Sequence, residues 1–217
     1  MIRNLIFDLD GTLIDSLEGI RTAINKTLEV SNLDISFSYE EAKFLIGDGS
    51  ETLIKRALGH LYGNNQKTKE VRNNYYQLYE EYQIGGAKLF KDLKDVIISL
   101  INNGLNCFVV TNKPDKLAQI ITRHFYGNLF KEIRGIKEGD KVKPDPSLVL
   151  NLMNRYNLKS SETLYVGDSH VDVETAKNAQ LKCALCTWGY ELNYPKYIKE
   201  ADYILENVDD LLKLCEK

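Results

Sequence analysis

The chain has 217 residues, with 28 Lys and Arg against 31 Asp and Glu, so its formal net charge is −3. This balance, without a marked basic or acidic block, gives no support for binding nucleic acid or a membrane surface. No apolar segment is long enough to span a bilayer, and the first residues enter a predicted strand at once. We therefore expect a protein without a signal peptide, located in the cytoplasm.

The first predicted strand, near residues 4–8, ends in Asp8 and Asp10, which are followed by Gly11. Two carboxylates at the end of a buried strand repel each other and lose hydration, which costs free energy. A bound cation offsets this cost, and such acids are also kept where a reaction uses them. Oxygen ligands of this kind suit Mg²⁺, which also keeps waters and phosphate oxygens. Asp8 is then a candidate nucleophile that forms an aspartyl-phosphate. Because Asp also favours turns, a turn cap is the alternative interpretation of this pair.

The interval after the first strand has no strand signal. Its apolar spacing predicts amphipathic helices near 17–28, 39–46, 51–61 and 69–82. We interpret 16–86 as a helical cap inserted into a core formed by 1–15 and 87–217. Hinges near Asp15 and Gly86 would let such a cap close over a substrate and reopen for release.

Strand and helix patterns alternate in the remainder of the chain. Strands are expected near 106–111, 132–135, 163–167, 181–186 and 202–205, with helical patterns such as 92–103 between most of them. This alternation predicts an α/β fold, in which a parallel sheet carries helices on both faces. Open parallel sheets bind ligands at the carboxyl ends of their strands.

Polar groups stand at three of these later strand ends. Thr111 and Asn112 follow the second strand, where a hydroxyl and nearby N–H groups can hold phosphate oxygens. Lys143 stands in a segment stiffened by prolines, and a rigidly held ammonium can neutralise phosphate charge and restrain the nucleophile. Asp168 follows the fourth strand and is the candidate for a further metal ligand.

These segments, in this order, resemble the haloacid dehalogenase superfamily of phosphohydrolases over essentially the whole chain. The resemblance implies that Asp8 is the nucleophile and a metal ligand. It also implies that Asp10 is the general acid/base and offers its backbone carbonyl to the metal. The dehalogenating branch carries no acid two positions after the nucleophile, so Asp10 favours phosphoryl transfer. One residue can protonate the leaving oxygen and then activate water.

The resemblance assigns the other site residues as well. It implies phosphate binding by Thr111 and Asn112, the superfamily's active-site lysine at Lys143, and the remaining carboxylate ligand at Asp168. Asp172 would stand behind the ligands and orient metal-bound water. The implied fold is a Rossmann-like parallel sheet of strand order 3-2-1-4-5 with an inserted four-helix cap.

The cap carries a more specific resemblance, to the phosphoglycolate phosphatases. Gly47-Asp48-Gly49 and the predicted helix after it are similar to a loop and helix of that group. Gly47 would allow the backbone close to a ligand, and Lys55 or Arg56 could reach a substrate carboxylate. The alternative is a plain turn followed by a solvated basic helix face.

Several other residues are not assigned to catalysis. The cysteines at 107, 183, 186 and 215 are expected to be reduced and buried, because one C-x-x-C pair alone does not complete a zinc site. His170 is expected to be peripheral, since an oxygen-lined Mg²⁺ site needs no histidine. Trp188-Gly189-Tyr190 either borders the site or forms a surface turn.

The sequence thus predicts a Mg²⁺-dependent phosphatase acting on a small phosphomonoester, with 2-phosphoglycolate as the leading candidate. A pyrophosphatase, a sugar phosphatase or a phosphomutase would use the same residues, and a non-catalytic phosphate-binding regulator is the alternative of another class. The expected partner is a small phosphorylated metabolite, without nucleic acid or membrane. We expect a monomer or a homodimer.

Overall fold

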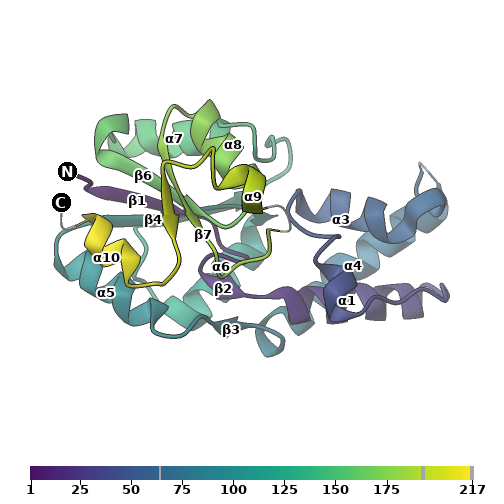
Figure 1. The fold of residues 1–217 in the computed structure, drawn as a ribbon. Helices are drawn as coiled ribbons and strands as arrows, with labels where there is room; N and C mark the ends of the chain where they lie inside the picture. Colours follow the sequence, from purple (N-terminus) through teal and green to yellow (C-terminus); the bar gives the residue numbers. More distant parts are fainter. Residues whose placement is uncertain (64, 192–193, 216–217) are drawn as a thin grey trace. The chain divides into compact units, whose positions relative to one another are not determined.

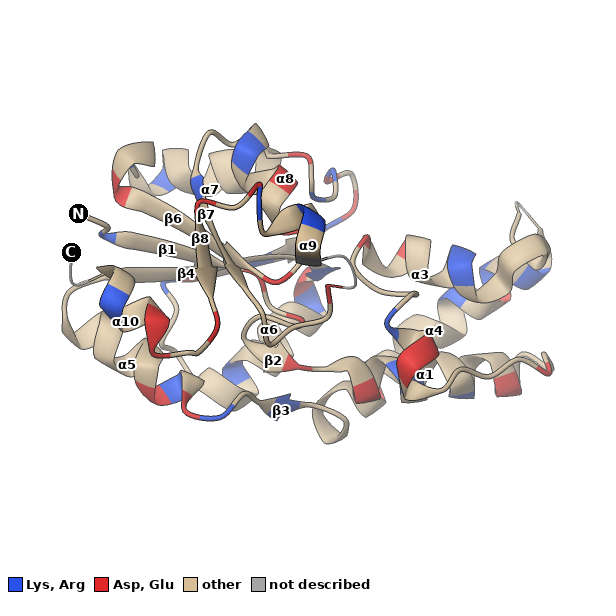
Figure 2. Cartoon of the chain, viewed as in Figure 1, with Lys and Arg blue, Asp and Glu red and all other residues tan. Residues whose placement is uncertain are grey.

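The computed structural model describes residues 1–63, 65–191 and 194–215 (Figure 1). The chain divides into two compact units, one formed by Met1–Ile14 with Leu89–Lys217 and the other by Asp15–Lys88. The first unit is α/β and the second is mainly helical. Lys and Arg are interspersed with Asp and Glu in both units in the view of Figure 2. None of the helices in the described part of the chain combines the length and the apolar character needed to cross a membrane.

A parallel six-stranded sheet forms the centre of the α/β unit, in the order β5-β4-β1-β6-β7-β8. Its strands are β1 (Asn4–Phe7), β4 (Asn106–Pro114), β5 (Glu132–Ile136), β6 (Thr163–Gly167), β7 (Lys182–Cys186) and β8 (Tyr203–Leu205). The predicted order 3-2-1-4-5 is confirmed, and the strand expected near 202–205 extends it by pairing with β7. Phe7 pairs with Val109 and Val166, so β1 lies between β4 and β6.

Helices cover both faces of this sheet (Figure 1). They are α5 (Leu93–Asn102), α6 (Asp115–Tyr126), α7 (Ser147–Tyr156), α8 (His170–Asn178), α9 (Tyr194–Tyr197) and α10 (Asp210–Cys215), with a short 3₁₀ helix at Ser160–Glu162. One buried cluster joins Leu148 and Val149 of α7 to Phe108 and Tyr165 of the sheet. The central strands β1 and β6 are buried at every residue and are largely apolar, as expected inside a parallel sheet, whereas the edge strand β5 alternates buried and half-buried residues.

The helical unit contains α1 (Leu17–Val30), α2 (Tyr39–Ala42), α3 (Gly49–Leu58) and α4 (Gln66–Gly85), with a 3₁₀ turn at Gly59–Leu61. α1 and α4 pack side by side, with the Gly19 N–H donating to the Gly86 carbonyl at 2.9 Å. A Cβ on Gly86 would overlap the backbone of Gly19, so this close approach requires glycine. That this unit acts as a substrate cap stays a prediction.

Two predicted helices of this unit were too long. The helix expected at 39–46 ends at Ala42, and the chain then turns toward Gly47, whose φ of +107° a helix cannot contain. The helix expected at 51–61 ends at Leu58 because Gly59 adopts a φ of +54°. The helix expected at 69–82 instead extends in both directions, as α4.

The structure also differs from the predictions where the two units join in the chain. A two-stranded sheet that the sequence did not predict pairs β2 (Ile14–Asp15) with β3 (Lys88–Leu89). Within the helical unit, Lys88 Nζ lies 3.3 Å from Asp15 Oδ2. The chain therefore enters and leaves this unit through adjacent segments.

Candidate active site

The first candidate residue, Asp8, follows directly on β1. Its backbone N–H donates to the Val166 carbonyl of β6 at 2.9 Å, which continues the parallel pairing past the end of the strand. The residue is only 9% exposed, and its Oδ1 lies 2.8 Å from Lys143 Nζ. Beyond this ion pair, no other group in the described part of the chain donates to Oδ1. The carboxylate thus keeps acceptor capacity toward the site.

Lys143 is buried and held from both its ends. Its backbone N–H donates to Asn112 Oδ1 at 2.7 Å, and its carbonyl accepts from Asn112 Nδ2 at 3.1 Å. Its ammonium donates to Asp172 Oδ1 at 2.7 Å and to the Tyr165 hydroxyl at 3.1 Å. Burial opposes the charge, but the pull of Asp172 and Asp8 prevails and raises the pKa of Lys143 well above its usual value. This ammonium therefore stays charged beside the candidate nucleophile.

Asp172 is fully buried in the first turn of α8 and is surrounded by donors. Its Oδ2 accepts from the backbone N–H groups of Asp168 and Ser169, at 3.2 and 3.1 Å, and from the Ser169 hydroxyl at 2.7 Å. Its Oδ1 accepts from Lys143. A carboxylate that already accepts this many hydrogen bonds is suited to orient Lys143 and Asp168.

Asp168 follows β6 and is 2% exposed. Its Oδ1 accepts from the Thr12 hydroxyl at 3.0 Å, and its Oδ2 accepts from the Tyr190 N–H at 2.7 Å. Burial, with Asp172 and Asp8 nearby, raises the pKa of Asp168 well above its usual range. Thr12 and Tyr190 are contacts that the sequence interpretation did not assign to this carboxylate.

Asp10 lies in the turn after β1 and faces a lysine that the sequence analysis did not single out. Lys113 Nζ lies 3.0 and 3.2 Å from the two carboxylate oxygens of Asp10. The Lys113 side chain is 1% exposed and that of Asp10 is 22% exposed. Asp10 is thus the most accessible of the four acids.

Thr111 and Asn112 lie inside β4, which corrects the strand end predicted at residue 111. The register of β4 against β5 is irregular between Val110 and Pro114, so this stretch departs from regular pairing. Thr111 Oγ1 accepts from the Lys113 N–H at 3.3 Å. The structure thereby brings Thr111 and Asn112 to the edge of the sheet where β1 ends, and Asn112 is engaged with Lys143.

The donor set of this site fits a hard divalent cation. Oxygens of Asp8, Asp168 and Asp172 lie within 4.8 Å of one another, and all three residues are buried. Burial raises the pKa of Asp8 to about 6, against the opposing pull of Lys143 and with Asp172 adding to the rise. Three buried carboxylates beside one buried ammonium, Lys143, leave negative charge uncompensated, and Mg²⁺ binds oxygen ligands of this kind. The residues present therefore fit such an ion.

The two site residues predicted in the helical unit form one local structure. Arg56 of α3 donates to the carbonyls of Leu45 and Ile46, at 3.3 and 2.9 Å, and forms an ion pair with Asp48. These bonds fix the loop that contains Gly47. Arg56 therefore has a clear role in holding the loop, and substrate contact by Gly47 or Arg56 stays a prediction.

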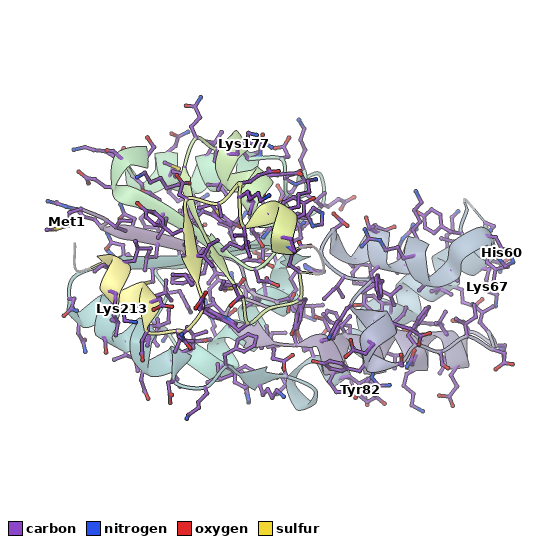
Figure 3. All side chains as sticks on the ribbon, viewed as in Figure 1. Met1, His60, Lys67, Tyr82, Lys177 and Lys213 are labelled. Atoms are coloured by element: carbon purple, nitrogen blue, oxygen red, sulfur yellow. The ribbon has the colours of Figure 1, made fainter. Side chains whose placement is uncertain are left out.

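The structure agrees with the non-catalytic roles expected for the cysteines and for His170. All four cysteines are free and buried, as expected. His170 begins α8, and its Nδ1 lies 3.1 Å from Glu191 Oε2. The exposed His60 lies at the surface of the helical unit in Figure 3. The segment Trp188-Gly189-Tyr190 borders Asp168 and is not a plain surface turn.

Comparison with known proteins agrees with this geometry. A family model described as haloacid dehalogenase-like hydrolase matches residues 5–186. The chain is 32% identical to the phosphoglycolate phosphatase of Pectobacterium atrosepticum, over 98% of this chain and 92% of the relative. It is 33% identical to the phosphoglycolate phosphatase of Yersinia pseudotuberculosis, over 97% of this chain and 92% of the relative.

A solved structure gives the same result. The crystal structure of a predicted phosphoglycolate phosphatase from Haemophilus somnus superposes with a TM-score of 0.90 at 28% identity. The match covers 99% of this chain and 98% of that one. The similarity therefore extends over both units of the chain.

Proposed function

Since this chain belongs to the haloacid dehalogenase-like hydrolases and is a phosphatase of that family, we propose that it hydrolyses 2-phosphoglycolate through an aspartyl-phosphate on Asp8. The observation that carries the mechanism is the buried group of Asp8, Asp168 and Asp172 around the Lys143 ammonium. Asp10, two residues after Asp8, is the accessible acid beside it. A binding protein would need neither a buried nucleophile nor a proton donor.

In the first step, Asp8 attacks phosphorus and the bond to the leaving oxygen breaks, while Asp10 gives its proton to that oxygen. Lys143 restrains Asp8 and neutralises charge on the transferring phosphoryl group. Thr111 Oγ1 and the backbone N–H groups beside it hold phosphate oxygens. Because the Asn112 amide is bonded to Lys143, this residue contributes through its backbone N–H.

In the second step, Asp10 takes a proton from water, which attacks the phosphoryl group on Asp8 and releases inorganic phosphate. The bond between Asp8 and phosphorus breaks in this step, so Asp8 returns to the carboxylate and Asp10 to the protonated acid. Asp8, Asp168 and the backbone carbonyl of Asp10 would hold Mg²⁺, which supplies charge neutralisation for the phosphoryl oxygens when bound. Asp172 would orient these ligands from behind.

The proposed substrate rests on two supports. Relatives that are about 30% identical over nearly the whole chain are named phosphoglycolate phosphatases. The loop at Gly47, held by Arg56, offers a glycine-containing backbone segment in the helical unit. We propose that this unit is a cap and that this loop contributes to selecting the small substrate.

The test is phosphate release from 2-phosphoglycolate, pyrophosphate, glucose 6-phosphate and a nucleoside monophosphate, each with and without Mg²⁺. We expect the highest kcat/KM for 2-phosphoglycolate, dependence on Mg²⁺, and no release by Asp8→Asn. A higher kcat/KM for another member would overturn the proposed substrate and leave the chemistry standing. Metal-independent release would contradict the proposed cofactor.

A further inference from the structure

A short loop after β7 lies directly against Asp168, although it is distant in sequence. The Tyr190 N–H donates to Asp168 Oδ2 at 2.7 Å. The backbone of Gly189 lies so close to the same carboxylate that a Cβ there would overlap the Asp168 side chain. Glycine is therefore required at 189 for the loop to reach this position.

The turn after β1 touches Asp168 as well. Gly11 has a φ of +87°, and a Cβ on it would also overlap the Asp168 carboxylate. The Thr12 hydroxyl donates to Asp168 Oδ1 at 3.0 Å. Asp168 is thus enclosed by two backbones and receives one hydrogen bond on each oxygen, which restricts its side chain to one orientation.

The two segments are tied to each other. Trp188 Nε1 donates to the Thr12 carbonyl at 3.1 Å, and the Trp188 ring packs near Phe90, with 6.4 Å between the ring centroids. Trp188 therefore links the loop after β7 to the turn after β1. Movement of the loop would therefore break the Tyr190 bond to Asp168 and the Trp188 bond that anchors the Thr12 backbone.

We propose that Trp188, Gly189 and Tyr190 form a positioning element that sets the affinity of the site for Mg²⁺ by fixing the orientation of Asp168. The contacts of these three residues with Asp168 and with the turn after β1 are made by the backbone of Gly189 and Tyr190 and by the Trp188 indole N–H. Groups that orient a ligating carboxylate typically change metal affinity by 10- to 100-fold when they are altered. The proposal rests on the proposed function only in taking Asp168 as a cation ligand.

The experiment is isothermal titration calorimetry of MgCl₂ into the metal-free full-length protein. Gly189→Ala is expected to raise the Kd for Mg²⁺ by about 10- to 100-fold because the added methyl group displaces Asp168. Trp188→Phe retains a ring beside Phe90 but loses the N–H donor, and it is expected to raise Kd by about fivefold, the factor for one lost hydrogen bond. In both variants, saturating Mg²⁺ should restore kcat.

Ile97→Val is the matched control, because Ile97 is buried on α5, an element that contains neither Asp168 nor the loop after β7. It should lower stability slightly and leave the Kd for Mg²⁺ unchanged, so a general loss of stability is separated from a loss of positioning. Should Gly189→Ala not fold, Trp188→Phe carries the test alone. If every folded loop variant had the same Kd for Mg²⁺ as the wild-type protein, the proposal would be overturned.

Two further outcomes separate this proposal from the proposed function. In the first outcome, the wild-type protein binds Mg²⁺ and Asp168→Asn does not, but the wild-type protein releases no phosphate from any substrate. This outcome would refute the proposed function and leave the positioning role intact. Wild-type protein that does not bind Mg²⁺ at millimolar concentration would overturn the positioning role.

Discussion

Lys113 Nζ lies 3.0 and 3.2 Å from the two carboxylate oxygens of Asp10, and the lysine side chain is almost completely buried. The pair joins the turn after β1 to the end of β4, and it determines which way the proposed acid/base faces. Asp10 has to turn from this lysine toward the substrate to deliver its proton. The contact therefore defines the starting position of the proton-transfer group.

Lys113→Met should lower kcat/KM by about 10- to 100-fold, because an acid/base displaced by about 1 Å loses this much. Mg²⁺ binding should be retained, since the proposed ligands are other groups. Steady-state kinetics on 2-phosphoglycolate measure the effect. Lys213→Met removes an exposed lysine of α10 and should retain wild-type kinetics. Equal kinetics for both variants would show that Lys113 does not position Asp10.

Asp10→Asn should retain Mg²⁺ binding, because this residue is proposed to offer its backbone carbonyl, and should lose turnover by about 10²- to 10⁴-fold. Calorimetry with MgCl₂ and phosphate release measure the two effects separately. Unimpaired turnover would remove Asp10 as the acid/base. A loss of Mg²⁺ binding would point to its side chain as a ligand.

Asn112→Ala should destabilise the fold by about 1–3 kcal/mol, since it leaves the buried N–H and carbonyl of Lys143 without their partners. It should also lower kcat, because Lys143 is no longer held beside Asp8. Asn102→Ala is the matched control, because Asn102 is an exposed asparagine of α5. Urea unfolding should find Asn102→Ala close to wild type and Asn112→Ala less stable, and equal stability of all three proteins would contradict this account.

Stability without metal should depend on pH through Asp8. Because burial raises the pKa of Asp8 to about 6 in the folded protein, the folded state binds a proton there that the unfolded state releases near its ordinary pKa of 3.8. This contribution is fully present below pH 3.8 and is lost as pH rises to about 6. In EDTA, Asp8→Asn should therefore gain stability relative to wild type between pH 4.5 and pH 7.5. Urea unfolding at the two pH values measures this, and a constant difference would contradict it.

Thiol chemistry tests the burial of the cysteines. Burial raises the pKa of Cys107 to about 12 and that of Cys215 to about 11, and it raises the pKa values of Cys183 and Cys186 as well. The thiolate is the reactive form, so Ellman's reagent at pH 8 should react slowly with the native protein and rapidly in urea. Rapid reaction of one thiol in the native state would identify a site that is more open than the structure shows.

The sequence predicted the centre of the sheet well because β1 and β6 are largely apolar runs that are buried at every residue. The order of its strands came from the resemblance to a known family, since periodicity alone does not fix which strands are neighbours. The helix ends were less accurate. At Gly47 and Gly59 the backbone enters the left-handed region, and the apolar spacing on either side gave no sign of this.

The placement of Asp8 and Asp168 could be predicted because each follows the end of an apolar strand, and Lys143 was assigned through the resemblance. Lys113 could not, because its burial depends on a partner 103 residues away in sequence. Asn112 was predicted for its chemistry, but its two bonds to Lys143 depend on a fold that joins β4 to a later loop. The role of Gly189 follows from the space left beside Asp168, which no local pattern encodes.

The central claim is that Asp8 is phosphorylated during turnover. The most direct test is acid quenching of the Mg²⁺-loaded enzyme during turnover of 2-phosphoglycolate, followed by mass spectrometry of its peptides. We predict the mass of one phosphoryl group on the peptide that contains Asp8, and none in Asp8→Asn. Full turnover by Asp8→Asn, or a phosphoryl group carried by another residue, would contradict the claim.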